Sequence, residues 1–453
     1  MKKLFLLGLA FASTASMVSA QDYVSGGQQV YKEGYNFSVE WANLDLVGKP
    51  GWVALGKRTG VGVNDKFYVN NMDDNTFSIY GPKGFISNIA IPQGFAWAGT
   101  SVDQSGNVIM RASSEKWPGT GAYGGCYYPG KTGNLFYFIN SKTDQLVTST
   151  PAELDAYDGR TDALGFTMGD ILSGETPIFL VGDNKMRLAE MYYDEAENSM
   201  IGVNYKITIN SAFAGTGAGA VKVLGTAQAY GELSADGLYT QIAVSPNYVH
   251  DANNGGDVIT NNGLRNYIQR YAYGFNPDSQ LDEFLPTDEF FVTPQHGGLA
   301  GFLIFELGGK QFIAYPVAQA SDALAIAELT TVDTPVSDDT LDASSLVVRH
   351  FASINETTKD VAYLGSVTAP MTLSYEPVEG EDAVYIYTYC QFGAMMKYKF
   401  GVGSGAGIDN VAVDNNADAP VEYYNIDGVR VAYPTAGNIY IRKQGTSVAK
   451  VVY

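Results

Sequence analysis

Histidines, which most often perform acid–base catalysis or bind metals near neutral pH, are scarce in this chain. Only three are present, His250, His296 and His350, and none lies in a metal-binding motif such as H-E-x-x-H. His296 stands in the turn-like stretch 293–298, which favours a structural role. The chain lacks the G-x-S-x-G element of serine hydrolases. It also lacks a phosphate-binding loop, because the glycine-rich stretch 215–219 has no lysine directly after it. We therefore predict no catalytic residue, no metal ligand and no cofactor.

Carboxylates are abundant instead, with 48 Asp and Glu against 28 Lys and Arg. Two carboxylates about 5 to 10 Å apart can cleave a glycosidic bond, but spacing along the chain does not reveal such a distance. We interpret the pairs Asp73–Asp74 and Asp338–Asp339 and the cluster Glu379–Asp382 as solvated turns. The loop Asn247–Asn262 offers oxygen ligands of the kind that bind calcium. It does not follow the EF-hand spacing, and we interpret it as a polar loop.

The densest group of side chains suited to ligand binding is the stretch Trp117–Pro129, in which glycines and prolines separate a tryptophan from three tyrosines. Trp117, Tyr123, Tyr127 and Tyr128 are the candidate binding residues. Aromatic faces pack against the C–H surfaces of sugars, while tyrosine hydroxyls form hydrogen bonds. The alternative is that these rings pack between sheets or fill a central channel. The remaining tryptophans are predicted core residues: Trp41, Trp52 and Trp97.

The elements that would position these side chains follow a period of two residues, which predicts β-strands. The runs 66–69 and 76–80 enclose an Asn/Asp-rich turn, and similar units recur about every 40 to 70 residues. Strand 384–390 is apolar or aromatic on both faces, so it needs cover on each side. Blades around an axis supply that cover, so we predict an all-β fold with a propeller of six or seven blades. Tandem β-sandwiches are the alternative, and the alanine-rich stretch 318–329 could instead be helical.

Composition narrows the class of protein further. Of the 453 residues 45% are hydrophobic, which provides for a sizeable core and argues against wholesale disorder. The formal net charge is −20 and we find no basic patch, so phosphate groups would repel the chain. We therefore exclude nucleic acid as a partner.

The first twenty residues have the pattern of a signal peptide. Lys2 and Lys3 precede an apolar run from Leu4 to Ala12, and the small residues of 18–20 fit a cleavage site. The apolar run is too short to span a bilayer, and no other segment resembles a span. We therefore predict an exported protein, in the periplasm, at the outer-membrane surface or outside the cell. Export permits a disulfide between Cys126 and Cys390, whereas the apolar strand around Cys390 favours a buried thiol.

The composition changes after the predicted propeller domain, residues 21–402. Residues 403–420 have almost no large apolar groups and read as a linker, and residues 421–453 form a small β module. The ending "YYNIDGVRV…PTAGNIYIRKQGTSVAKVVY" resembles the C-terminal sorting tail of the type IX secretion system of Bacteroidetes. The matching residues are Asp427, Gly428, Gly437, Tyr440 and Lys450. The body more loosely resembles propeller-like, uncharacterised exported proteins of gut Bacteroides and their relatives, a likeness that implies no activity.

Three hypotheses for function follow from these observations. The first is an exported binding or interaction protein that recognises a glycan or another surface protein through its loops. The second, on the same scaffold, is a glycan-cleaving hydrolase or lyase, in which charged side chains would converge in one pocket. The third is a structural envelope protein without a small ligand. The lack of a catalytic motif favours the first over an enzyme.

Overall fold

The protein consists of two units, each described here by itself. The computed structural model describes residues 28–30, 34–43, 45–46, 56–57, 59–114, 134–154, 164–182, 187–206, 221–233, 239–251, 267–291, 301–315, 322–329, 346–351, 372–389, 395–403, 421–425, 430–431, 439–444 and 447–452. The first unit comprises Met1–Lys32 and Phe37–Val402, and the second comprises Glu33–Asn36 and Gly403–Tyr453. The following lie outside the described residues: the predicted signal peptide, the predicted linker after Gly403, Trp52, the aromatic stretch 117–129 and both cysteines.

Strands account for nearly all the regular structure that the described residues contain, which confirms the prediction of an all-β protein. The exception is one turn of 3-10 helix, η3 (Ile171–Ser173), which Asp170 caps by accepting from the Leu172 N–H. No helix in the described part of the chain is long and apolar enough to cross a membrane.

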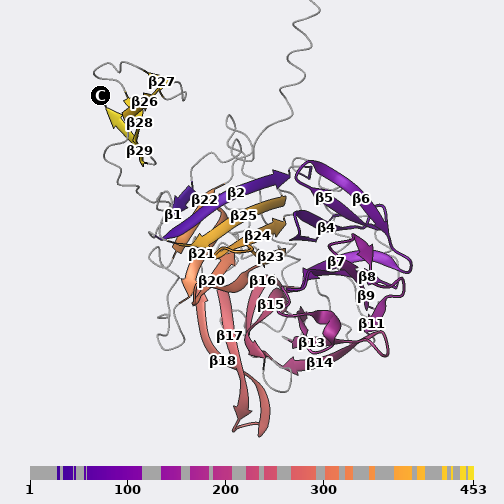
Figure 1. Ribbon diagram of the computed structural model, residues 1–453. Helices are drawn as coiled ribbons and strands as arrows, with labels where there is room; N and C mark the ends of the chain where they lie inside the picture. Colours follow the sequence, from indigo (N-terminus) through magenta and orange to yellow (C-terminus); the bar gives the residue numbers. More distant parts are fainter. Residues whose placement is uncertain are drawn as a thin grey trace, which may run out of the picture. The chain divides into compact units, whose positions relative to one another are not determined.

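Two four-stranded sheets of the first unit lie against each other (Figure 1). One contains β3 (Gly60–Val63), β4 (Lys66–Asn71), β5 (Thr76–Gly81) and β6 (Gly84–Ala90), in that order. The other has the order β2 (Tyr35–Asn43), β25 (Met395–Val402), β24 (Ala383–Tyr389) and β23 (Thr372–Pro377). Strand β2 therefore completes a sheet whose other members come from the end of the unit.

An eight-stranded sheet forms the next part of the unit. Its order begins with β12 (Ile178–Gly182), β13 (Arg187–Asp194) and β14 (Ser199–Lys206). It continues through β11 (Ala152–Leu154), β9 (Asn134–Asn140), β8 (Asn107–Ser113) and β7 (Phe95–Val102), while β10 (Gln145–Leu146) pairs with β9. The two halves meet where β11 pairs with β14 through Glu153 and Ser199, in parallel, whereas the other pairs are antiparallel.

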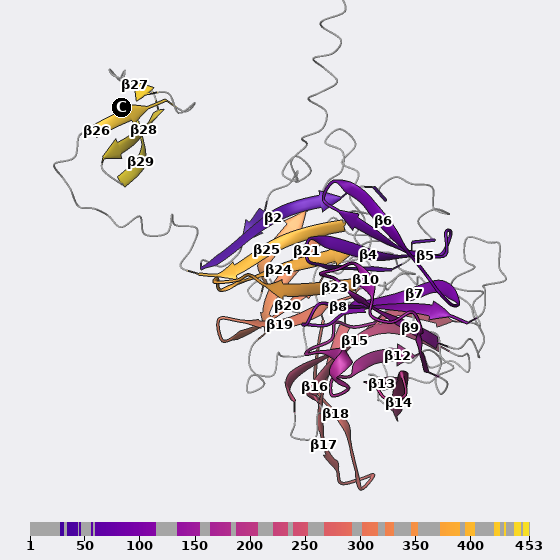
Figure 2. The ribbon, with the colours of Figure 1, turned by 45° about the vertical axis from the view of Figure 1, so that its right-hand side comes forward.

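Two further sheets complete the first unit (Figure 2). One is built of long strands: β15 (Val221–Leu233), β16 (Tyr239–Asp251), β17 (Tyr267–Asn276) and β18 (Leu281–Phe291). The other has the order β1 (Gln28–Val30), β22 (Leu346–Phe351), β21 (Asp322–Leu329), β20 (Lys310–Tyr315) and β19 (Leu303–Leu307). Like β2, strand β1 comes from the start of the chain and joins a sheet whose other strands come from much later in the sequence.

Close packing between sheets explains the glycines of β3. A Cβ at Gly62 would lie 2.4 Å from the Cβ of Tyr387, and one at Gly60 would lie 2.7 Å from the ring of Tyr389. Phe67 from β4 fills the adjoining space, with its ring 5.8 Å from that of Tyr387. Since interiors are close-packed, only glycine lets β3 approach β24 this closely.

Two sequence-based expectations need correction. The alternative of a helix over 318–329 is wrong, because Asp322–Leu329 forms strand β21 between β20 and β22. Leu324–Ala327 are all buried there, so burial on both faces overrides the weak helix preference of alanine. Trp97 is a core residue as predicted. Trp41 is the second correction: it is also predicted to be a core residue, but it is only partly buried, and its ring meets that of Phe67 edge-on at 5.6 Å.

The second unit contains one antiparallel sheet, in the order β27 (Arg430–Val431), β26 (Val421–Tyr424), β28 (Ile439–Gln444) and β29 (Ser447–Val452). The rings of Tyr423 and Tyr440 lie 6.4 Å apart, and Tyr440 is buried. Arg430 pairs with Glu422 at 3.0 Å across neighbouring strands.

Candidate functional site

The segment that carries the four predicted binding residues connects two paired strands. Trp117, Tyr123, Tyr127 and Tyr128 lie outside the described residues, but both flanks of their segment are described. Ser113, the last residue of β8, pairs with Asn134, the first of β9. Residues 114–133 are therefore the connection of a hairpin whose register is set on either side.

The base of this connection is buried and closely packed. Arg111 of β8 is only 5% exposed, and its guanidinium donates to the side-chain oxygen of Asn134. Gly99 of β7 has φ +122°, and a Cβ there would lie 3.2 Å from the Arg111 side chain. Both ends of the connection are therefore fixed to the sheet.

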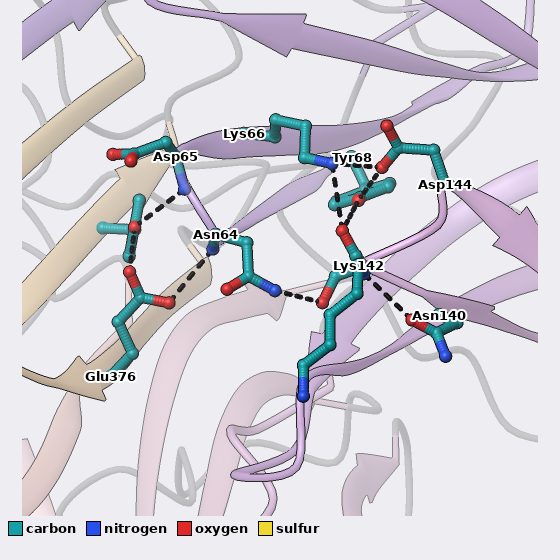
Figure 3. A network of polar contacts seen from close by, with 10 residues as sticks. Asn64, Asp65, Lys66, Tyr68, Asn140, Lys142, Asp144 and Glu376 are labelled. Carbon is teal, nitrogen blue, oxygen red and sulfur yellow. Dashed lines mark hydrogen bonds and ion pairs between the residues drawn. The ribbon is translucent and has the colours of Figure 1, made fainter. Parts of the chain in front are cut away.

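A polar network lies at the opposite end of β9, where the chain turns toward β10 (Figure 3). The Lys66 ammonium donates to the Ser141 carbonyl at 3.0 Å and pairs with the Asp144 carboxylate. The Tyr68 hydroxyl donates to the same carboxylate at 2.5 Å, and the Asn64 amide donates to the Ser141 hydroxyl at 2.6 Å. These contacts tie β4 and the β3–β4 turn to the sheet of β9.

The β3–β4 turn also reaches the sheet of β23–β25. Asn64 and Asp65 both have positive φ, 49° and 58°, as the favoured two-residue hairpin turn requires. The backbone N–H of Asn64 donates to Glu376 at 3.0 Å, and that of Asp65 donates to the Tyr387 hydroxyl at 3.1 Å. Tyr387 in turn donates to Glu376. One turn therefore connects three sheets (Figure 3).

Lys397 is the buried charge of this junction. Its side chain is 6% exposed, pairs with the Asp65 carboxylate and lies 3.9 Å from Glu376. Its ammonium stands 3.5 Å from the centre of the Tyr385 ring, a close cation–π contact. The indole N–H of Trp41 donates to Asp65 at 3.3 Å.

The pKa shifts of the junction follow from burial and from these pairs. Burial acts to raise the pKa of Asp65, but the hydrogen bond and charge of Lys397 outweigh it and leave the pKa below its usual value. Burial and the neighbouring Glu376 raise the pKa of Tyr387, and burial with Asp144 raises that of Tyr68. Both phenols therefore stay neutral donors, and the arrangement fixes sheets together rather than preparing a nucleophile.

A second polar cluster holds the segment 164–170 against β7. Asp103 is 2% exposed and accepts from the Asn107 N–H at 2.7 Å and from the Ile171 N–H at 2.9 Å. Burial, with a smaller contribution from Asp170, raises the pKa of Asp103. The backbone of Thr167 bonds to Val102 and Gln104, so the segment extends the sheet beyond β7.

Tyr375 of β23 contacts this segment and a third sheet. Its hydroxyl accepts from the Gln104 amide at 2.9 Å, and its ring lies 4.8 Å from Phe166 and 5.6 Å from Phe305 of β19. The sequence shows 103–107 as a polar turn, but it does not reveal the partners at 164–171 or at Tyr375, far along the chain.

The predicted acidic turns stand apart from both clusters where they are described. Asp73 and Asp74 are exposed between β4 and β5, and Glu379–Asp382 are exposed between β23 and β24. The pair Asp338–Asp339, most of the loop 247–262 and the side chains of all three histidines lie outside the described residues. Within the described part of the chain, no three His, Cys, Asp or Glu side chains are grouped to hold a metal ion.

No family model and no curated protein matches the chain. Solved structures match at low identity. An auxiliary nutrient binding protein from Bacteroides ovatus is 10% identical over 82% of this chain and 77% of its own, with a TM-score of 0.40. Virginiamycin B lyase from Staphylococcus aureus is 10% identical, and the match covers 80% of this chain and 99% of the lyase, with a TM-score of 0.38. A protein of unknown function from Bacteroides caccae is 10% identical, and the match covers 64% of this chain and 84% of that protein, with a TM-score of 0.33. Likeness at these TM-scores does not establish a shared activity or ligand.

Proposed function

We propose that the sheets of the first unit form a closed six-bladed β-propeller. Four sheets would supply one blade each, and the eight-stranded sheet would supply two, joined where β11 meets β14. Contacts of β3 with β23, β24 and β7, and of β15 with β12 and β19, support a ring. The Ser374 hydroxyl donates to the Gly62 carbonyl across 312 sequence positions. Tandem sandwiches would keep such early and late strands apart.

On this scaffold we propose an exported binding protein that recognises a glycan or a surface protein through residues 114–133. The observation that carries the proposal is the buried base of this connection. There Ser113 pairs with Asn134, and Arg111 donates to the Asn134 side chain. Connections longer than about 12–15 residues are usually functional or unstructured. Strands β8 and β9 on either side of it are almost wholly buried, so they give the connection a rigid base.

A glycan array tests this proposal. The full chain carrying Trp117→Ala or Tyr127→Ala should lose retention on the glycans that the unaltered protein binds, and its melting temperature should not change. Phe85→Ala is the matched control, because Phe85 is an exposed aromatic residue of β6, 54% accessible, outside the connection. Full retention by the Trp117 and Tyr127 variants discards the site. If the unaltered protein is retained on none of the glycans, a surface protein remains as the proposed ligand. Cleavage of the glycans would favour the alternative of a hydrolase or lyase.

Export rests on residues 1–20 and on the resemblance of 421–453 to a sorting tail. The proposed cleavage after Ala20 leaves Gln21 as the first residue. Sequencing the N-terminus of the protein recovered from the medium or the envelope should give Gln21. Recovery with Met1 in the cytoplasm would contradict export.

A further inference from the structure

The hairpin of β17 and β18 extends away from the other sheets of its unit in both views (Figures 1 and 2). Ten paired positions run from Tyr267 opposite Phe291 to Asn276 opposite Leu281. Only the first part of β17, through Ala272, pairs with β16. The outer part of the hairpin is thus a two-stranded ribbon with no further strand beside it in the described residues.

The inner part of this ribbon is fixed by aromatic packing. Tyr271 and Phe284 are buried, 1% and 5% exposed. The Phe284 ring lies 5.1 Å from Tyr273 across the ribbon and 6.0 Å from Phe179 of β12. The ribbon therefore has a firm attachment from which its outer end projects.

The outer end is itself preorganised by hydrogen bonds. The N–H of Gln280 donates to the Asn276 carbonyl at 2.8 Å, and the N–H of Asp278 donates to the Asn276 side chain at 2.9 Å. The Gln280 side chain donates to the Pro277 carbonyl, and both Asn276 and Ser279 donate to Glu283. A tip whose own polar groups bond internally needs little ordering when it binds, which favours affinity.

Two large apolar side chains nevertheless face solvent at this tip. Phe275 is 55% exposed and Leu281 is 64% exposed. Three acidic residues, Asp278, Asp282 and Glu283, lie in this outer part of the hairpin, and residues 271–287 contain no Lys or Arg. Phe275 pairs across the ribbon with Asp282, so the exposed ring lies beside a carboxylate on the same face, and phenylalanine is enriched in the cores of interfaces.

We infer that the tip of the β17–β18 hairpin is a docking element for a partner protein that presents an apolar pocket ringed by Lys and Arg. Phe275 enters the pocket, and Asp278 and Asp282 face the basic rim. Charge selects this occupant, because an acidic tip is repelled by anionic lipid headgroups. A second copy of this chain carries its own net charge of −20 and is disfavoured for the same reason.

Selection from a phage-displayed library of short random peptides tests the inference. The bait is the unaltered full chain, and the affinity of each selected peptide is then measured for the unaltered chain and for the variants. We expect basic peptides with an aromatic or aliphatic residue, which bind the Phe275→Ala chain at least about tenfold more weakly, the effect of truncating an aromatic anchor. Phe85→Ala, equally exposed, should leave their binding unchanged. Asp278→Asn with Asp282→Asn should flatten the salt dependence of binding.

Neutral or acidic peptides, no peptides, or equal losses with Phe85→Ala would overturn the inference. Two parallel measurements identify the other occupants. A dimer in sedimentation that Phe275→Ala dissociates would assign the tip to a second copy. Binding to phosphatidylcholine vesicles that Phe275→Ala abolishes would assign it to a membrane. Either result would contradict a basic partner protein.

Discussion

Lys397 of β25 and Asp65 of the β3–β4 turn form an ion pair across 332 positions of the sequence. The lysine is 6% exposed and the aspartate 65%, so the pair reaches from the interior of one sheet to the surface of the next. Because the same turn bonds to Glu376, Tyr387 and Ser141, it fastens an early sheet to both of its neighbours. The sheets that begin and end the unit are thus joined by specific polar contacts as well as by packing.

Removing the lysine should weaken this junction. Lys397→Met is expected to lower the free energy of unfolding by about 1.5 to 3 kcal/mol, the usual contribution of hydrogen bonds to charged groups. Lys399→Met is the matched control on the same strand, since Lys399 pairs with Glu381 at 2.7 Å but is 29% exposed. That change should cost less than about 1 kcal/mol. Urea unfolding compares the two, and equal losses would contradict a special role for Lys397.

The junction should also make the stability of the fold decrease at acidic pH. The pKa of Asp65 is lower in the folded protein than its usual value of about 3.8, so ionised Asp65 stabilises the fold above that value. This contribution disappears as the pH falls through the lowered pKa. Asp65→Asn should therefore reduce stability at neutral pH and flatten its decline below about pH 4. Calorimetric melting at a series of pH values checks this, and a decline parallel to that of the unaltered protein would refute it.

Packing between β3 and β24 gives a prediction of a different kind. Gly62→Ala should destabilise the protein by about 1 to 3 kcal/mol, because the new Cβ would lie 2.4 Å from Tyr387. Gly274→Ala is the matched change in another strand, where a Cβ meets nothing within 4 Å. It should leave stability nearly unchanged. A thermal melt of both variants decides, and a Gly62 variant as stable as the Gly274 variant would show that the sheets do not meet there.

Local patterns predicted the strands well and long-range contacts poorly. The runs 66–69 and 76–80 became β4 and β5 with only small extensions, because an Asn/Asp turn between β-branched and aromatic residues is a local signal. Strand β21 was ambiguous, since alanine prefers helix unless neighbouring strands bury it. Glu376, Tyr387 and Lys397 had no signal at all as partners of the β3–β4 turn, because nothing near them in sequence marks a contact over 300 positions away.

The ring of sheets is tested most directly by a disulfide between β7 and β23. The hydroxyl oxygens of Thr100 and Thr372 lie 3.5 Å apart in the interior, although 272 positions separate them. Thr100→Cys with Thr372→Cys, with Cys126 and Cys390 replaced by serine, should form a bridge on mild oxidation, because side chains whose γ atoms already touch need only a small movement to reach the S–S bond length of about 2 Å. Mass spectrometry of the digested protein should then find the two strand peptides linked, and neither single variant should show the link. A fully reduced double variant in the folded protein would mean that these strands belong to separate domains, and the ring would be wrong.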